Sequence, residues 1–139
     1  MARQDTRSEE LYFKAIDSPV GGLTLVGNDN GLAAALWAVE RPGRVVLDIA
    51  GESQAHPTLV EAERQLKQYF DGRRRAFELK LNAQGTTFQK SVWAALLRIP
   101  FGETRTYRQI ALELGSANAA RAVGAANGRN PISIITPCH

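Results

Sequence analysis

The first half of the chain contains three short apolar runs separated by turn residues. The runs occupy residues 11–17, 22–27 and 31–39. Ser18-Pro19 follows the first run, and Asn28-Asp29-Asn30-Gly31 separates the second from the third. Asn, Asp and Gly favour tight turns because they tolerate positive φ. The pattern therefore predicts a short antiparallel meander of three strands.

A helix is predicted from Pro57 to Phe70, because proline suits a first turn and apolar residues recur there at spacings of three and four. Asp71-Gly72 should end it. Residues 40–56 have a mixed character and we expect a loop there, whereas the alternation over 77–81 predicts another strand. We expect no polar groups to converge on a site in this half, which should support the second half.

Three helices are predicted in the second half of the chain. They are expected over residues 87–98, 107–114 and 119–127, and threonines can cap the first two, Thr86 or Thr87 and then Thr106. A short turn after Gly115 separates the last two helices. Helix, short turn, helix is the outline of a helix-turn-helix unit.

The last ten residues carry the most distinctive chemistry. Residues 132–135 are mostly β-branched and lie between two prolines, which predicts a short buried strand. This strand leads to Cys138, the only cysteine, and then to His139, one of two histidines. A thiol held beside an imidazole is a candidate nucleophile. A lone cysteine is also commonly a small buried apolar residue, and these two residues alone leave both interpretations open.

Length and composition limit the number of domains and the compartments in which the protein is expected. A chain of 139 residues makes one domain or two small lobes. A single cysteine excludes an internal disulfide and a Cys-rich zinc site, which fits a reducing, cytoplasmic setting. No apolar run approaches the ~20 residues of a membrane span. Residues 1–10 are charged, and we interpret them as a disordered leader rather than a secretory signal.

Charge is distributed unevenly along the chain. The net charge is +3, and from Thr86 onward there are six basic but only two acidic residues. A basic half favours a polyanionic partner, although charge alone more often marks a solvated surface. In the last helix Arg121 is the only long side chain, so base-by-base readout in the major groove is not expected. A slim helix entering the minor groove fits better, and tight packing on a neighbouring element also explains the small residues.

These parts make sense together if the substrate is a base within a DNA duplex. Chemistry on such a base requires the nucleotide to leave the stack, at a cost of about a few kcal/mol. Arg121 suits the gap left behind, because its planar guanidinium stacks on bases and donates hydrogen bonds. Tyr107 offers a rigid ring and a hydroxyl for the flanking phosphate. The extruded base would then meet the sulfur of Cys138.

The combined pattern resembles the O6-alkylguanine-DNA alkyltransferases, also called methylated-DNA–protein-cysteine methyltransferases. The resemblance extends from about Thr86 to His139, and more loosely through residues 17–21. It is carried by a series of short motifs at the spacing of that family: Thr87-Phe88-Gln89, Val92-Trp93, Ile99 to Glu103, Thr106-Tyr107, Ala119 to Gly124, Asn130-Pro131 and Pro137-Cys138-His139.

The resemblance implies an α/β + α fold of two lobes. A ribonuclease-H-like lobe with a short antiparallel sheet is expected over residues 11–81, and a winged-helix-like DNA-binding lobe with the helix-turn-helix over 86–139. The implied reaction is stoichiometric DNA repair, in which Cys138 takes and keeps the alkyl group of O6-alkylguanine, or of O4-alkylthymine. No cofactor is implied, and since the first half has no cysteine we expect no metal. The implied partner is double-stranded DNA containing O6-alkylguanine. The protein is expected to act as a monomer and not to bind a membrane.

Residue roles follow from the same resemblance. Cys138 is the acceptor, His139 its base through a water, and Asn130 orders the turn that precedes them. Tyr107 acts on the phosphate, lines the pocket and can protonate the leaving guanine, and Arg121 replaces the flipped base. The further DNA contacts expected are Thr106, Ala120, Ala122, Gly124 and Asn127.

One departure from the family lies at the end of the sequence. After Cys-His the family has an arginine, a loop that closes the alkyl pocket and a glutamate that orients the histidine, whereas this sequence stops at His139. We therefore expect a fragment or a truncated protein; truncation should weaken or abolish alkyl transfer and partly retain DNA affinity. Two other functions stay open: a DNA-binding or damage-sensing module with a structural cysteine, and a cysteine hydrolase, which would need an oxyanion site.

Overall fold

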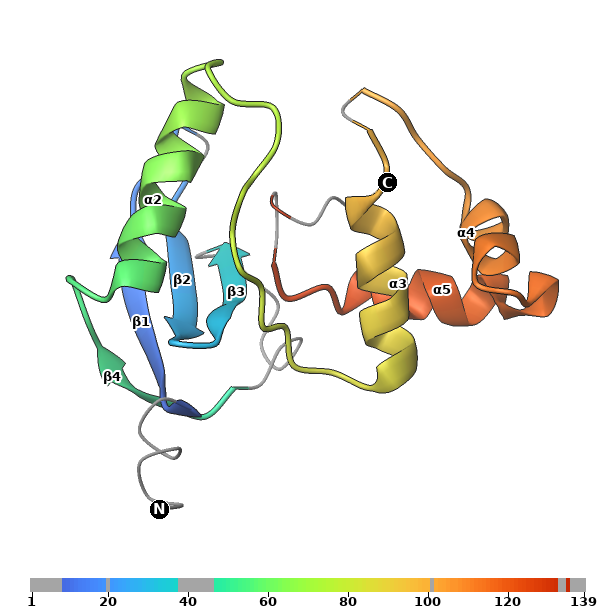
Figure 1. The fold of residues 1–139 in the computed structure, drawn as a ribbon, viewed down its shortest axis with the longest axis horizontal. Helices are drawn as coiled ribbons and strands as arrows, with labels where there is room; N and C mark the ends of the chain where they lie inside the picture. The colour runs from blue at the N-terminus through green and yellow to red at the C-terminus, as the bar shows by residue number, and fades with distance from the viewer. Residues whose placement is uncertain (1–8, 20, 38–46, 101, 133–134, 136–139) are drawn as a thin grey trace.

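A small sheet with one helix and a group of shorter helices form two adjoining lobes (Figure 1). The computed structural model describes residues 9–19, 21–37, 47–100, 102–132 and 135. Strands β1 (Leu11–Ile16), β2 (Leu23–Asn28) and β3 (Gly31–Trp37) pair in antiparallel fashion, which confirms the predicted meander. Among the described residues, no helix combines the length and apolar character that a membrane span requires.

A fourth strand, β4 (Ile49–Glu52), corrects the prediction of a loop over residues 40–56. It pairs in parallel with β1, so that the sheet order is β3-β2-β1-β4 and the sheet is mixed rather than antiparallel. The strand lies at the edge of the sheet and is largely exposed. Because it buries no apolar face, it has no alternating pattern from which it could be recognised.

Helix α2 (Pro57–Phe70) has the predicted bounds and covers one face of the sheet (Figure 1). Leu59, Ala62 and Leu66 are fully buried on it and pack in one core cluster with residues of β2 and β3. Lys14 on β1 donates to Glu63 on α2, with Nζ and Oε1 2.7 Å apart, and this hydrogen bond holds the pKa of Glu63 below its usual range. Apolar burial and an ion pair thus both fix the helix on the sheet.

The chain after α2 passes between the two lobes and attaches to the outer edge of β3 (Figure 1). Leu32 of β3 donates its N–H to the carbonyl of Lys80 at 2.8 Å and accepts from the N–H of Asn82 at 2.7 Å. The strand predicted over residues 77–81 is reduced to this one bridge at Leu81. Upstream, the buried side chain of Gln65 donates to the carbonyl of Glu78 and accepts from its N–H. These backbone groups of Glu78 are therefore bonded to a side chain rather than to a neighbouring strand.

The second lobe is built from helices α3 (Thr87–Leu97), α4 (Tyr107–Glu113) and α5 (Ala120–Gly128), with a 3-10 turn η1 (Ala117–Ala119) before α5. The three predicted helices are confirmed. Thr86, rather than Thr87, caps α3, and Thr106 caps α4; both form capping boxes with the glutamine three residues later. The core of the lobe is apolar and includes Val92, Leu96, Ile110, Ala111 and Val123.

The segment that follows α5 returns to the sheet and attaches to β3 as well. The N–H of Ala35 donates to the carbonyl of Pro131 at 2.8 Å, and Ala35 and Ile132 form a parallel bridge. Ile132 and Ile135 are buried in the cluster that α2 forms with the sheet. Of the strand predicted over 132–135, the structure shows one bridge at Ile132, while residues 133–134 lie outside the described part of the chain.

Replacing Ile132 by alanine should lower the free energy of unfolding by about 2–4 kcal/mol, because a fully buried isoleucine leaves a cavity in the core of the sheet lobe. Ile49→Ala is the matched control, since Ile49 is 38% exposed on the edge strand, and it should cost about 0.5 kcal/mol. Urea denaturation of both variants provides the measurement. Similar small losses for the two variants would show that Ile132 is not a core residue of that lobe.

Candidate functional site

Cys138 and His139, the predicted acceptor and its base, lie outside the described residues. The structure does describe the elements that lead to them. These are the helix-turn-helix formed by α4 and α5, the turn at Asn130, and the two isoleucines that anchor the following segment in the sheet lobe.

The turn at Asn130 is held by its own side chain. Asn130 is 1% exposed, and its Oδ1 accepts from the N–H of Ile132 at 3.0 Å. The N–H of Asn130 donates to the carbonyl of Asn127 at 3.2 Å, at the end of α5. An asparagine that bonds the backbone two residues on forms a stable turn. The chain therefore leaves α5 in a fixed direction and reaches β3 one residue later.

Tyr107 lies over α5 and contacts two other predicted site residues, Gly124 and Asn127. Its hydroxyl oxygen accepts a hydrogen bond from Nδ2 of Asn127 at 3.2 Å. Its ring lies against Gly124, where an added Cβ would come within 2.9 Å of the ring atom Cε2. Gly124 and Asn127 are three residues apart and thus share one face of α5. The structure thereby gathers Tyr107, Gly124 and Asn127 into one contact.

Arg121 lies one turn earlier on the same face of α5 and is exposed. The arginines Arg98 and Arg105 are paired with Glu113 and Glu103, whereas among the described residues no carboxylate pairs with Arg121. A guanidinium without a competing carboxylate can bind an anion or a base edge at little cost. Of the other predicted contacts, Thr106 and Ala122 are exposed, Ala120 and Gly124 are half-buried, and Asn127 is 8% exposed.

The buried indole of Trp93 was predicted only as core, but it also fixes α5. Its Nε1 donates to the carbonyl of Ala126 at 2.9 Å, one helix residue before Asn127. This bond ties α3 to the end of α5 from which the Asn130 turn departs. Buried tryptophan usually finds a partner for its N–H, so the sequence signals that such a bond exists but not where it ends.

An apolar cavity of about 250 Å³ lies between the lobes, next to the Asn130 turn. Its walls come from the connecting segment, from α3 and from the turn itself: Leu81, Ala83, Trp93, Leu97, Asn130 and Ile132. Lys90 on α3 is the charged residue that lines it. The cavity shows that the junction of the lobes is not fully packed along the described residues.

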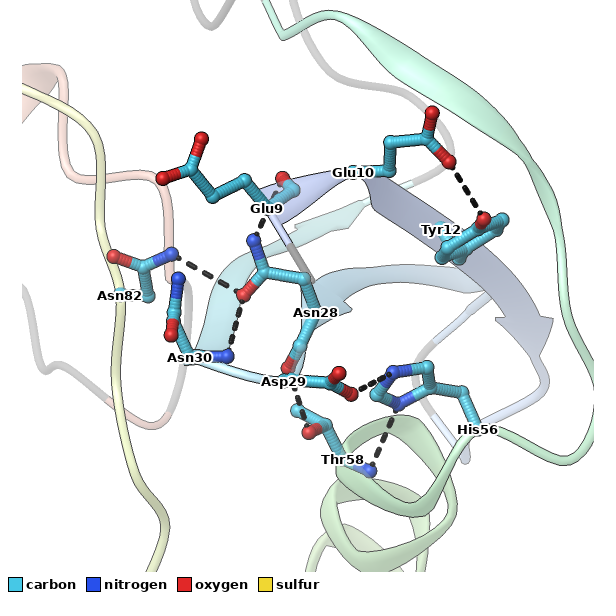
Figure 2. Close-up of polar contacts among 9 residues, drawn as sticks. All are labelled: Glu9, Glu10, Tyr12, Asn28, Asp29, Asn30, His56, Thr58 and Asn82. Atoms are coloured by element: carbon cyan, nitrogen blue, oxygen red, sulfur yellow. Dashed lines mark hydrogen bonds and ion pairs between the residues drawn. The ribbon is translucent and has the colours of Figure 1, made fainter. Parts of the chain in front are cut away.

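Polar groups of the first half form a structural cluster around the turn between β2 and β3 (Figure 2). Asn28 is 3% exposed; its Nδ2 donates to the carbonyl of Glu9, and its Oδ1 accepts from the N–H of Asn30 and from Nδ2 of Asn82. Thr58 on α2 donates to the carbonyl of Asn28 at 2.8 Å. The cluster joins the turn to α2 and to the connecting segment, and so supports the attachment to β3.

A further contact of this cluster joins Asp29 to the start of α2. His56 Nε2 lies 3.0 Å from Asp29 Oδ1, while its Nδ1 accepts from the N–H of Thr58 and caps the helix. Within the described ranges, no three His, Cys, Asp or Glu side chains gather as a metal site. The absence of a metal from the protein stays a prediction.

Comparison with known proteins extends over both lobes. Residues 11–83 match the family model of the 6-O-methylguanine DNA methyltransferase ribonuclease-like domain, and residues 87–139 match that of the DNA binding domain of the same family. A methylated-DNA–protein-cysteine methyltransferase of Methanosarcina barkeri is 47% identical over 130 residues, which cover 93% of this chain and 80% of that protein. One of Mycobacterium tuberculosis is 43% identical over 134 residues, or 93% of this chain and 76% of that protein.

Solved structures agree with the sequence comparison. The crystal structure of the Mycobacterium tuberculosis O6-methylguanine methyltransferase superposes with a TM-score of 0.78 at 43% identity, over 93% of this chain and 76% of that one. A crystal structure of Mycobacterium tuberculosis OGT in complex with DNA gives a TM-score of 0.75 at 43% identity, over 92% and 76%. With both lobes matched in sequence and in fold, the chain belongs to the 6-O-methylguanine DNA methyltransferase family, whose relatives are named methylated-DNA–protein-cysteine methyltransferases.

Proposed function

We propose that this protein repairs DNA directly, by moving the alkyl group of O6-alkylguanine in a duplex to Cys138. Membership of the methyltransferase family supports the reaction class, and a relative crystallised in complex with DNA supports the partner. The observation that carries the proposal for this chain is the fixed path from α5 to β3. The Asn130 turn and the Ala35–Pro131 bond hold residues 130–132 beside the helix-turn-helix, and Cys138 follows six residues later in the sequence.

The DNA is proposed to bind across the helix-turn-helix, with α5 in the minor groove. The exposed residues of α5 around Arg121 are small, so the helix can approach the floor of a narrow groove. Arg121 would then enter the stack where the damaged nucleotide has left it, since no carboxylate among the described residues holds it back. Thr106 and Tyr107, exposed at the start of α4, face a flanking phosphate in this arrangement.

The proposed chemistry is a displacement at the alkyl carbon. The thiolate of Cys138 attacks that carbon, a sulfur–carbon bond forms, and the bond from carbon to O6 of guanine breaks. His139, through a water, takes the thiol proton beforehand, because only the thiolate is strongly nucleophilic. The electron pair of the broken bond stays on the base, which leaves as neutral guanine once it receives a proton from Tyr107. The product thioether is stable, so each protein molecule reacts once.

We further propose that a single copy is sufficient. One chain carries Arg121 and Tyr107 on its helix-turn-helix and Cys138 at the end of the attached segment, so no residue from a second copy is needed. The damaged base is proposed to be O6-alkylguanine, with O4-alkylthymine as a secondary substrate. Both place an alkyl carbon on an exocyclic oxygen that a flipped base would present in the same way.

Replacing Cys138 by alanine should abolish alkyl transfer from an O6-methylguanine duplex and leave the affinity for undamaged duplex within about twofold of wild type, because transfer needs the sulfur and docking does not. Transfer is measured by loss of the modified base from the DNA, and affinity by fluorescence anisotropy. A protein that only senses damage would keep all of its measurable activity in this variant. That result would contradict the proposed function.

Replacing Arg121 by alanine should slow repair of duplex DNA by at least about tenfold, since flipping costs a few kcal/mol and about 1.4 kcal/mol corresponds to a factor of ten. Reaction with the free base O6-benzylguanine, which needs no flipping, should be unchanged. Arg129→Ala, which removes the same charge just after α5, controls for general attraction to DNA. Equal losses on duplex and free base in the Arg121 variant would rule out the gap-filling role.

A further inference from the structure

Tyr107 is held at two points by residues on one face of α5. Nδ2 of Asn127 donates to its hydroxyl oxygen at 3.2 Å, and the ring rests on Gly124. Tyr107 itself is 41% exposed, whereas Asn127 is 8% exposed. An exposed tyrosine is thus fixed from beneath by a buried amide, with its outer side left open to solvent.

Gly124 is the residue that allows the ring to lie this close. A Cβ there would come within 2.9 Å of Cε2 and 3.0 Å of Cδ2 of Tyr107, which is closer than nonbonded carbon atoms approach. Gly128, one turn later on α5, would place a Cβ in open space, with nothing within 4 Å. The same residue type on the same helix is therefore required at one position and replaceable at the other.

The direction of the Asn127 hydrogen bond decides what the phenol can do next. An amide nitrogen has only protons to give, so the phenolic oxygen acts as the acceptor in this contact. The O–H of Tyr107 is then left for an acceptor on the exposed side. Donation to the oxygen also polarises the O–H, which strengthens the hydrogen bond that it gives in turn.

We propose that Asn127 and Gly124 act on DNA through Tyr107, as positioning residues that turn its O–H toward the bound nucleotide. The proposal rests on the function proposed above and assigns these two residues a role other than direct DNA contact. The burial of Asn127 supports this role, because a side chain that is 8% exposed offers little surface to a duplex. Its amide is instead directed at the one phenol on this surface of the helix-turn-helix among the described residues.

A double-mutant cycle tests the contribution of Asn127. The single-turnover rate on an O6-methylguanine duplex at saturating DNA is measured for wild type, Asn127→Ala, Tyr107→Phe and the double variant. Each single variant should be about tenfold slower than wild type, a typical effect of one lost hydrogen bond. The double variant should be no slower than Tyr107→Phe, because the proposed effect of Asn127 on the reaction passes through the phenol. Losses that multiply would overturn the proposal.

Asn127→Asp keeps the shape of the side chain and reverses the hydrogen bond, which guards against a variant that merely folds poorly. A carboxylate accepts, so the phenol must turn its proton inward, and the rate near neutral pH should fall at least as far as in Asn127→Ala. As the pH approaches the range where an aspartate protonates, the side chain regains a proton to donate, and the rate relative to wild type should recover. A ratio to wild type that does not change with pH would contradict the assigned direction.

Gly124→Ala and Gly128→Ala form the matched pair for the second contact. Both replace a helical glycine and should stabilise α5 by similar amounts in the absence of a clash. Gly124→Ala should slow transfer about tenfold by displacing the Tyr107 ring, whereas Gly128→Ala should react at the wild-type rate. Equal rates for the two variants would overturn the role of Gly124. A wild-type protein that transfers no alkyl group would instead refute the function on which the proposal rests.

Discussion

The outer edge of β3 is the constraint on which the rest of the structure depends. Leu32 bonds there to the segment that connects the lobes, and Ala35 bonds to Pro131, one turn away from α5. An unpaired edge strand leaves its N–H and C=O groups without partners. These two attachments give backbone groups of β3 hydrogen-bond partners, and they also fix the position of the attached segments. The sheet lobe thereby holds both the entry to the helical lobe and the exit from it. We propose that the sheet lobe supports the chemistry in this way, although it makes no proposed contact to DNA.

This arrangement explains why rigidity matters for a reaction that each molecule performs once. Nucleophilic substitution at carbon requires the nucleophile to lie in line with the bond that breaks. A nucleophile misplaced by about 1 Å reacts much more slowly. The described segment from α5 to Ile132 is fixed by the buried Asn130 turn, by Trp93 on the carbonyl of Ala126, and by Ile132 in the core of the sheet lobe. Tyr107 is fixed independently, by Gly124 and Asn127. The described residues that we propose for alkyl transfer are thus held in place before the DNA arrives.

Much of the fold could be predicted from local patterns in the sequence. The bounds of α2 follow from its proline and its apolar spacing, and the capped helices α3 and α4 begin at threonines with a glutamine three residues on. The exposed strand β4 was missed because it buries no apolar face, and the strand expected over residues 77–81 shrank to one bridge because Gln65 binds the backbone of Glu78. Contacts between residues far apart in the sequence could not be predicted. The polar cluster at Asn28 and the Tyr107–Asn127 bond join residues whose spacing along the chain has no periodic signature. The family resemblance named the site residues, but the way in which Asn127 and Gly124 hold Tyr107 needed the structure.

The most direct test of this account is the mass of the peptide that contains Cys138, after the wild-type protein has been incubated with excess O6-methylguanine duplex. This peptide should gain a single methyl group, no other peptide should be methylated, and one modified base should disappear for each protein molecule. Methylation at another residue, or removal of many bases per protein molecule, would contradict the proposed function.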